Sequence, residues 1–300
     1  MKSTNAEPVL VWTGNKNKLS NTIIEKFPSY INTYYEPFLG GGSIFCSLIN
    51  QVNNGDKDVD TFQLNDINTG LISLYHNIKY NVDTLVDKIE YYCETFNACQ
   101  SGNSVKNISI FENDTIDDCR DKPHLYNFYR FRYNEMKNDF GNVDMAALFY
   151  ILNKTCQRGL YRENKKGQFN TSFNYTKNLN PKIDKILDLN DIFNSFNVNF
   201  TCMDIFEFME RPFNQDDLVY MDPPYVPTRQ KYFTSYSHDL FLNGNEKLIQ
   251  LCDNLNKNNI KFIQSNSYCK YIVNNYKKYN IHPISNGNKN IKEVLISNFE

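Results

Sequence analysis

The chain has 300 residues, of which 41% are hydrophobic and 15% aromatic, which is enough to bury a sizeable core. Its formal net charge of −2 excludes a chain that is basic overall, so any surface for nucleic acid must be local. No stretch approaches the roughly 18 apolar residues of a membrane span, and the polar residues 1–7 do not resemble a signal peptide, so we expect neither membrane association nor secretion.

The eight cysteines are scattered, with no C-x-x-C pair and no Cys/His cluster of zinc spacing. We therefore expect reduced thiols and no metal site. The expected compartment is cytoplasmic or, for a viral protein, the host cytoplasm or the virion. The isolated histidines His76, His124, His238 and His282 are expected to be structural.

The N-terminal part of the chain has a sequence pattern that alternates between strands and helices. Tyr34–Glu36 predicts a strand, Pro37–Ser43 a glycine-rich turn and Ile44–Ile49 a helix. Phe62–Asp66 predicts a second short strand that ends in an acid, and the apolar spacing of Leu71–Ile78 predicts the helix after it.

From about Val82 this alternation gives way to long helical patterns, for example over Val143–Ile151. The polar, acidic residues 101–121 predict a surface loop. Further strands are expected at Val198–Thr201, Leu218–Met221 and Lys261–Gln264, near Ile281, and at Val294–Ile296. We therefore predict an α/β domain, residues 1–72 and 190–300, that is split by an insertion, residues 73–189.

The glycine-rich turn has the features of a nucleotide cradle. Gly40, Gly41 and Gly42 allow positive φ and let a ligand approach the backbone at the carboxyl end of the first strand. The spacing departs from G-x-G-x-x-G, and the Lys-Ser/Thr of a P-loop is absent. Asp66, which ends the next strand, can accept both ribose hydroxyls of a nucleoside. The alternative is a tight turn in which Ser43 caps the helix.

The tetrapeptide Asp222-Pro223-Pro224-Tyr225 directly follows the buried strand pattern Leu218–Met221. The prolines stiffen the backbone and lack an N–H, so carbonyls there can point into a cleft. The Asp222 carboxylate can accept a hydrogen bond from an amine, and the Tyr225 ring can stack on a base. This combination suits an enzyme that acts on the exocyclic amine of a flipped nucleobase. The alternative is a strand-end turn with a solvent-facing acid.

Residues 154–185 carry a local charge of +6 in a chain of net −2. The eight positive residues are Lys154, Arg158, Arg162, Lys165, Lys166, Lys177, Lys182 and Lys185, and the two negative ones are Glu163 and Asp184. Such a segment suits phosphate contacts, and either arginine can pair with a guanine edge. Gly167–Asn170 predicts a hairpin turn that offers aromatic and amide side chains to a groove. The alternative is a solvated basic surface.

The motifs occur in a characteristic order. They are Trp12-Thr13-Gly14-Asn15-Lys16, Glu36–Ser43, Asn65–Asn68, Asn153–Cys156 with Gly159–Arg162, and Asp222–Tyr225. Over nearly the whole chain this set resembles the Dam-type (D12 class, α-group) DNA adenine-N6 methyltransferases. The resemblance implies a Rossmann-like, AdoMet-dependent methyltransferase sheet with an inserted, mostly helical target-recognition domain that carries a β-hairpin.

The resemblance also implies the activity: a site-specific transfer of a methyl group from S-adenosylmethionine to N6 of a flipped adenine in duplex DNA. The implied catalytic residues are Asp222, Pro223, Pro224 and Tyr225. The implied cofactor-binding residues are Trp12, Gly14, Lys16, Glu36, Pro37, Phe38, Gly40, Gly42, Ser43, Asp66, Asp204, Ile205 and Asp222. The implied DNA-binding residues are Asn153, Lys154, Arg158, Arg162, Lys165, Lys166 and Asn170.

The target site is expected to be a short palindrome, GATC or another four-base sequence. Many Dam-type proteins have an aromatic-Asn pair where this chain has Gln157-Arg158, so GATC does not follow, although Arg162 matches the guanine-contacting arginine. Double-stranded DNA is the implied partner, and the resemblance allows a companion restriction endonuclease and a monomer or weak dimer.

Three alternatives remain open. An RNA or protein amino-group methyltransferase would more often have Asn in place of Asp222, and a cytosine-N4 enzyme would more often have Ser there. A DNA-binding protein without activity would show a damaged cofactor site, whereas Gly40, Gly42 and Asp66 are all present.

Overall fold

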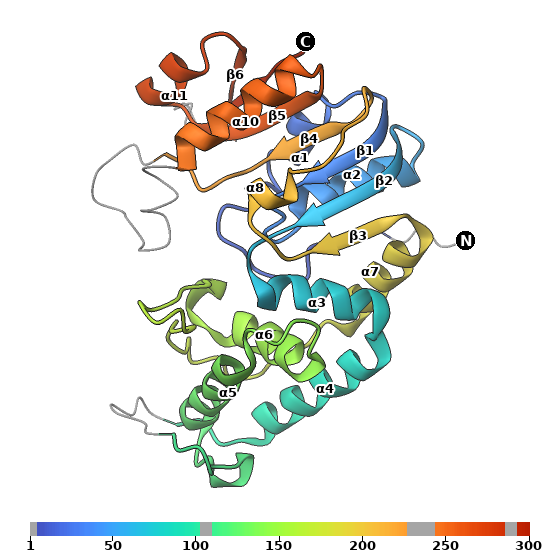
Figure 1. Cartoon of the computed structure of the whole chain (residues 1–300). Helices are drawn as coiled ribbons and strands as arrows, with labels where there is room; N and C mark the ends of the chain where they lie inside the picture. The colour runs from blue at the N-terminus through green and yellow to red at the C-terminus, as the bar shows by residue number, and fades with distance from the viewer. Residues whose placement is uncertain (1–4, 103–109, 227–243, 286–292) are drawn as a thin grey trace. The chain divides into compact units, whose positions relative to one another are not determined.

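The computed structural model describes residues 5–102, 110–226, 244–285 and 293–300 (Figure 1). The chain forms two compact units. The sheet unit consists of Lys16–Ile67 and Phe196–Glu300. The helical unit consists of Asn68–Ser195 and the N-terminal segment that ends at Asn15.

The sheet unit is built on seven strands within the described residues, in the order β3-β2-β1-β4-β5-β7-β6. They are β1 (Tyr30–Glu36), β2 (Asp58–Asn65), β3 (Val198–Thr201), β4 (Leu218–Met221), β5 (Lys261–Ser267), β6 (Asn280–Ile284) and β7 (Glu293–Ser297). Strands β1 to β5 are mutually parallel, and β7 is antiparallel to β5 and β6. The order reverses between β1 and β4, which is the point where open α/β sheets bind ligands. The predicted strands and the Rossmann-like α/β fold are thus confirmed.

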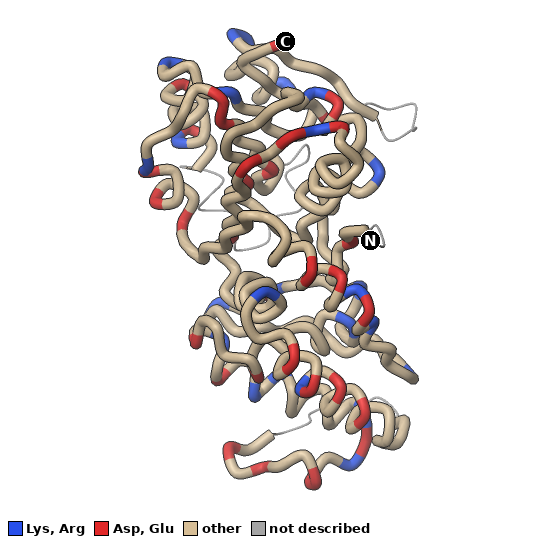
Figure 2. The backbone as a smooth tube through the Cα atoms, turned by 90° about the vertical axis from the view of Figure 1, so that its right-hand side faces the viewer, with Lys and Arg blue, Asp and Glu red and all other residues tan. Residues whose placement is uncertain are grey.

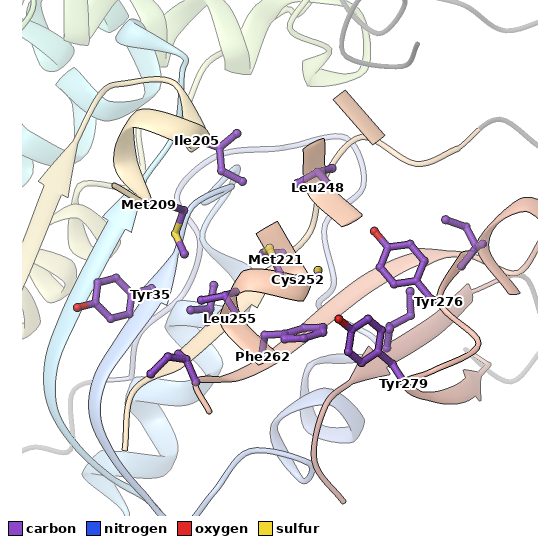
Figure 3. Packing of buried hydrophobic residues seen from close by; sticks show 14 of the residues in the cluster. Tyr35, Ile205, Met209, Met221, Leu248, Cys252, Leu255, Phe262, Tyr276 and Tyr279 are labelled. Atoms are coloured by element: carbon purple, nitrogen blue, oxygen red, sulfur yellow. The ribbon is translucent and has the colours of Figure 1, made fainter. Parts of the chain in front are cut away.

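Alternation along each strand gives the sheet two apolar faces. On one face Tyr34 packs edge-on against Phe62, which in turn meets Phe45 of α2 (Ser43–Asn53). The opposite face carries a hydrophobic cluster shown in Figure 3. Its members include Tyr35, Val219, Met221 and Phe262 of the sheet, Leu248, Cys252 and Leu255 of α10 (Asn245–Lys257), Ile205 of α8 (Ile205–Phe208) and Ile272 of α11 (Lys270–Asn275). Burial of each large side chain contributes about 1.5–3 kcal/mol, so packing on both faces stabilises the sheet. A short helix, α1 (Ser20–Ile24), precedes β1.

The helical unit is organised around α6 (Val143–Thr155), which is buried on nearly all sides. It packs against three helices: α3 (Thr69–Tyr80), α4 (Val82–Ala98) and α5 (Lys122–Met136). The Asn142 side chain accepts the Met145 N–H and so caps α6. The remaining elements are α7 (Ile183–Ser195) and the 3-10 turns η1 (Ile116–Asp118) and η2 (Gln157–Gly159). The predicted helix over Val143–Ile151 is therefore confirmed.

The hairpin after α6 exists, but its predicted turn is wrong in register. The two arms meet through the bridges Cys156–Phe173 and Glu163–Phe169. The Asn164 side chain accepts the N–H groups of Lys166 and Gln168, and Gly167 N–H bonds to the Asn164 carbonyl. The turn thus lies at 164–167 rather than at Gly167–Asn170, because an asparagine side chain and not a glycine starts it.

The domain boundaries at residues 72/73 and 189/190 stay a prediction, and the two compact units change at Ile67/Asn68 and at Ser195/Phe196. Helix α3 begins at Thr69 and α7 continues to Ser195, and both belong to the helical unit. The Asn190 side chain donates to the carbonyls of Ile78 and Lys79 and ties these helices together. The N-terminal segment up to Asn15 joins this unit as well.

Within the described ranges, every helix is too short or too polar to cross a membrane. The cysteines Cys46, Cys93, Cys99, Cys119, Cys156, Cys202, Cys252 and Cys269 are all free thiols.

Candidate active site

The glycine-rich turn connects β1 to α2. Gly40 and Gly42 adopt φ values of 50° and 70°, a left-handed conformation that favours glycine. Gly40 N–H donates to Oδ2 of Asp66 at 2.9 Å. Asp66 directly follows β2, so this hydrogen bond holds the turn beside the end of that strand. Gly42 precedes the first residue of α2, and the Oγ of Ser43 accepts the Lys16 N–H at 3.0 Å. Ser43 is therefore not the helix cap.

A buried asparagine joins the loops at the ends of three strands. Asn65 donates from Nδ2 to the carbonyls of Pro37 and Met203, and its Oδ1 accepts the Met203 N–H and the Thr201 hydroxyl. This places the glycine-rich turn beside the segment that leads to Asp204. Sequence reasoning did not assign Asn65 a role; the available signal was an asparagine at the end of the strand, next to the apolar Leu64.

Glu36, the last residue of β1, is almost fully buried below the turn. Burial raises the pKa of its carboxyl well above the usual value, while the hydroxyl of Tyr34, which donates to Oε2 at 2.9 Å, opposes that rise. The nearby Asp222 raises the pKa of Glu36 further. The acid is thereby biased towards its neutral form, which limits the negative charge gathered at the strand ends.

Asp222 follows β4 and forms an ion pair with Lys16, with 2.8 Å between Oδ2 and Nζ. The Lys16 side chain is 5% exposed and that of Asp222 is 19% exposed, so the pair is largely shielded from water. Burial raises the pKa of Asp222 to about 6, although Lys16 lowers it. The second oxygen, Oδ1, is buried and lacks a hydrogen-bond partner within the described residues. A carboxylate oxygen in that position is an acceptor held ready for an incoming N–H.

The rest of the Asp222–Tyr225 loop is anchored to β5 and β7. The Tyr225 hydroxyl donates to Oε2 of Glu293 at 2.9 Å. Val226 N–H donates to the side chain of Asn266 at 3.3 Å, and the Ser267 hydroxyl donates to the Val226 carbonyl at 2.8 Å. Pro223 is buried and Pro224 is exposed. Glu293 was missed by sequence reasoning because a single acid at the start of an apolar strand carries no motif.

The remaining residues expected to bind the cofactor lie at the same edge of the sheet. Asp204 is exposed and accepts the Phe206 N–H at 2.8 Å, which caps α8. Ile205 is buried in the hydrophobic cluster (Figure 3). Phe38 is partly buried against the same cluster. The strand ends therefore bring Phe38, Gly40, Asp66 and Asp204 to the carboxyl edge of the sheet, as the topology requires.

Trp12 and Gly14 belong to the helical unit, whereas Lys16 belongs to the sheet unit. The Trp12 ring stacks on Tyr161 with 6.0 Å between centroids, and it meets Phe149 at 6.3 Å. Gly14 is exposed, with φ at 81°. The W-x-G-x-K motif is therefore divided between the two units.

Asn153 and Lys154, at the end of α6, hold the N-terminal segment. Asn153 accepts the Val11 N–H at 3.0 Å and donates to the carbonyls of Val11 at 2.8 Å and Gly159 at 3.2 Å. The Lys154 ammonium donates to the Val9 carbonyl. Burial, together with the charges of nearby lysines, lowers the pKa of Lys154 to about 8. Both side chains thus make internal contacts.

The other residues expected to bind DNA are at the surface of the helical unit. Arg158 is exposed and adopts φ of 58°, in the η2 turn. Across the hairpin, Arg162 donates from Nε to Oδ1 of Asn170 at 2.8 Å and from Nη2 to the Asn170 carbonyl at 3.2 Å. Lys165 and Lys166 are exposed at the hairpin turn. Figure 2 shows the charges along the backbone, with both signs present in each unit.

Comparisons with known proteins agree with this arrangement. The family model for D12 class N6 adenine-specific DNA methyltransferases matches residues 12–289. The type II methyltransferase M.MjaIII of Methanocaldococcus jannaschii is 30% identical, over 98% of this chain and 99% of that protein. The type II methyltransferase M1.LlaDCHI of Lactococcus lactis subsp. cremoris is 29% identical, over 98% and 96%. A DNA adenine methylase of Haemophilus influenzae is 27% identical, over 78% and 69%. The chain belongs to the D12 class of N6 adenine-specific DNA methyltransferases.

Proposed function

We propose that this site-specific adenine methyltransferase uses S-adenosylmethionine and methylates an adenine that is flipped out of a short, palindromic duplex site. The observation that carries the proposal is the state of Asp222. Lys16 holds its Oδ2, and its Oδ1 is a buried acceptor with no hydrogen-bond partner in the described residues. An exocyclic amine is the natural complement of such an acceptor.

The carboxyl edge of the sheet fits the proposed cofactor. Gly40 and Gly42 leave the turn without a Cβ, so the methionine part of S-adenosylmethionine can approach the backbone. Asp66, which follows β2, is proposed to hold the ribose. Asp204, which follows β3, is proposed to accept a hydrogen bond from the adenine amine of the cofactor. When bound, the cofactor supplies an electrophilic methyl group on its sulfonium.

The residues of the chain orient the target base. The Asp222 carboxylate and the Pro223 carbonyl are proposed to accept the two N6–H groups, which favours a tetrahedral nitrogen with its lone pair directed at the methyl group. Lys16 restrains the carboxylate, and the Tyr225 ring stacks on the base. Asp222 is also proposed to take the proton that N6 sheds. Positioning and fixed charge therefore supply most of the acceleration.

We propose two different roles for the residues that were expected to bind DNA. Asn153 and Lys154 support the N-terminal segment, because their polar atoms bond to Val9, Val11 and Gly159. The exposed side chains are proposed to contact DNA. These are Arg158, Arg162, Lys165 and Lys166, and the half-buried Asn170 is proposed to act through its bond to Arg162. Lys165 and Lys166 at the hairpin turn can contact DNA phosphates. The guanidinium of Arg162, which Asn170 restrains, can bond to the edge of a guanine base.

Two further proposals concern the setting of the enzyme. Since two relatives are named type II methyltransferases, we propose a companion restriction endonuclease that reads the same site. We also propose that the enzyme acts in the cytosol, since its cysteines are free thiols. We propose in addition that it acts as a monomer or weak dimer.

The test is to incubate the purified protein with S-adenosylmethionine and unmethylated genomic DNA, and to map N6-methyladenine by single-molecule sequencing. We expect methylation at one short motif and its loss in Asp222→Ala. Cofactor binding without any methylated adenine would contradict the proposal and would direct the search to RNA or protein substrates.

A further inference from the structure

We infer that Glu293 is a positioning residue of the active site: its carboxylate fixes the Tyr225 ring against which the target adenine stacks, and its charge acts on Asp222. This inference rests on the roles proposed above for Tyr225 and Asp222. Glu293 lies outside residues 12–289, the segment that matches the family model. It is the first residue of β7.

The contact has one chemically sensible orientation. Burial strongly raises the pKa of the Tyr225 hydroxyl, and the negative charges of Asp222 and Glu293 raise it further, so the phenol stays protonated and donates. Its acceptor is Oε2 of Glu293 at 2.9 Å. Glu293 is the first residue of β7 and pairs with Ser267 of β5, so the acceptor stands on the sheet and not on a loop.

The ring is held from several sides. Its main chain is followed by Val226, whose N–H and carbonyl bond to Asn266 and Ser267 on β5. The Lys16 ammonium lies over the ring, 4.8 Å from its centroid, and also pairs with Asp222. Glu293, Tyr225, Lys16 and Asp222 therefore form one connected series. Removing its first member releases the ring at the hydroxyl end.

Glu293 also acts on Asp222 by charge. The titratable groups that interact with Asp222 are Lys16, Tyr34, Glu36, Tyr220, Tyr225 and Glu293. Burial is the largest influence and raises the pKa of Asp222; Lys16 lowers it and Glu293 raises it. Replacing Glu293 by a neutral residue should therefore lower the pKa of Asp222 and extend activity to lower pH. A residue that only stabilises the fold would not move this pH dependence.

The experiment compares Glu293→Ala, Glu293→Gln, Tyr225→Phe and the double variant E293A/Y225F, with the exposed Glu210→Gln as the matched control. Methylation kinetics are measured on a duplex oligonucleotide, and 2-aminopurine fluorescence at the target position reports stacking of the flipped base. We expect Glu293→Ala and Tyr225→Phe each to lower kcat about tenfold, and the double variant to lose no more than the worse single variant. Stacking should weaken in the same variants.

Glu293→Gln keeps an acceptor and removes the charge. It should lose less activity than Glu293→Ala, and the acid limb of its pH–rate profile should move to lower pH. If the losses of the single variants add, or if that limb stays in place, the inference is wrong. If Glu293→Ala does not fold, the profile of Glu293→Gln still decides. Failure of the proposed function would instead appear as a wild-type protein that methylates no adenine.

Discussion

Lys16 and Asp222 form an ion pair in which only one of the two carboxylate oxygens is used. The Nζ of Lys16 lies 2.8 Å from Oδ2, while Oδ1 is buried and has no hydrogen-bond partner among the residues that the structure describes. Burial makes the carboxylate costly, and the pKa of Asp222 accordingly rises to about 6. The ionised, buried carboxylate of Asp222 therefore lowers the stability of the fold. Such a cost is expected at a site where function competes with stability.

The first prediction concerns stability. The pKa of Asp222 is about 6 in the folded protein, against about 3.8 for an ordinary aspartate. The folded state therefore binds the proton more tightly, so the contribution of this group to stability is present below pH 3.8 and is lost as pH rises through 6. Asp222→Asn cannot ionise and escapes this loss. Relative to wild type, its free energy of unfolding should improve by about 3 kcal/mol between about pH 4 and about pH 8.

Urea denaturation at a series of pH values measures that difference. The sign is the decisive result, since a relative gain at low pH instead of high pH would contradict the assigned pKa. Glu210→Gln, at an exposed position, should show no comparable change.

The second prediction concerns the pH dependence of activity. Lys16 lowers the pKa of Asp222, so in Lys16→Met that pKa should rise above about 6. The acid limb of the kcat/KM profile should move to higher pH, opposite to the shift expected for Glu293→Gln. Steady-state rates from about pH 5 to about pH 9 check this result. Equal shifts in the same direction for both variants would show that neither charge acts on Asp222.

The third prediction separates a structural role of Asn153 from a role in DNA contact. Asn153→Ala removes three hydrogen bonds to the backbone of Val11 and Gly159. We expect a loss of about 2–4 kcal/mol in the free energy of unfolding and faster hydrogen exchange at the Val11 amide. Thermal melting and exchange mass spectrometry measure these effects. Unchanged stability with weakened DNA binding would instead make Asn153 a DNA contact.

The fourth prediction compares lysines that were expected to act alike. Lys165 and Lys166 are exposed at the hairpin turn, whereas the Lys154 ammonium bonds to the Val9 carbonyl. Lys165→Ala and Lys166→Ala should each reduce the slope of log K against log salt concentration by about one. Lys154→Met should leave the slope unchanged and lower the melting temperature. Fluorescence anisotropy with a duplex oligonucleotide, over a range of salt, gives the slopes.

Local patterns were sufficient for the architecture. The strand patterns that become β1 to β5 and the glycines that adopt positive φ can be recognised from neighbouring residues alone. The acids Asp66 and Asp222 were located because each directly follows such a strand. The hairpin turn was misplaced because Asn164 and not Gly167 organises it, and such side-chain turns compete closely with glycine turns.

Contacts between distant residues could not be predicted in this way. Asn153 and Val11 are separated by 142 positions, and Tyr225 and Glu293 by 68. No short motif records such pairs, since the register of packed elements determines them. The same holds for Lys16, whose place in the opening motif was recognised while its pairing with Asp222 was not.

The division of the chain has a consequence for protein engineering. The helical unit is assembled from two stretches of sequence, the segment that ends at Asn15 and Asn68–Ser195. A chimera that exchanges only the second stretch between relatives would pair a foreign α6 with the original Val9–Trp12 segment. Transplanting both stretches together keeps the Asn153 and Lys154 contacts intact, so specificity grafts in this protein should be made as two coordinated inserts.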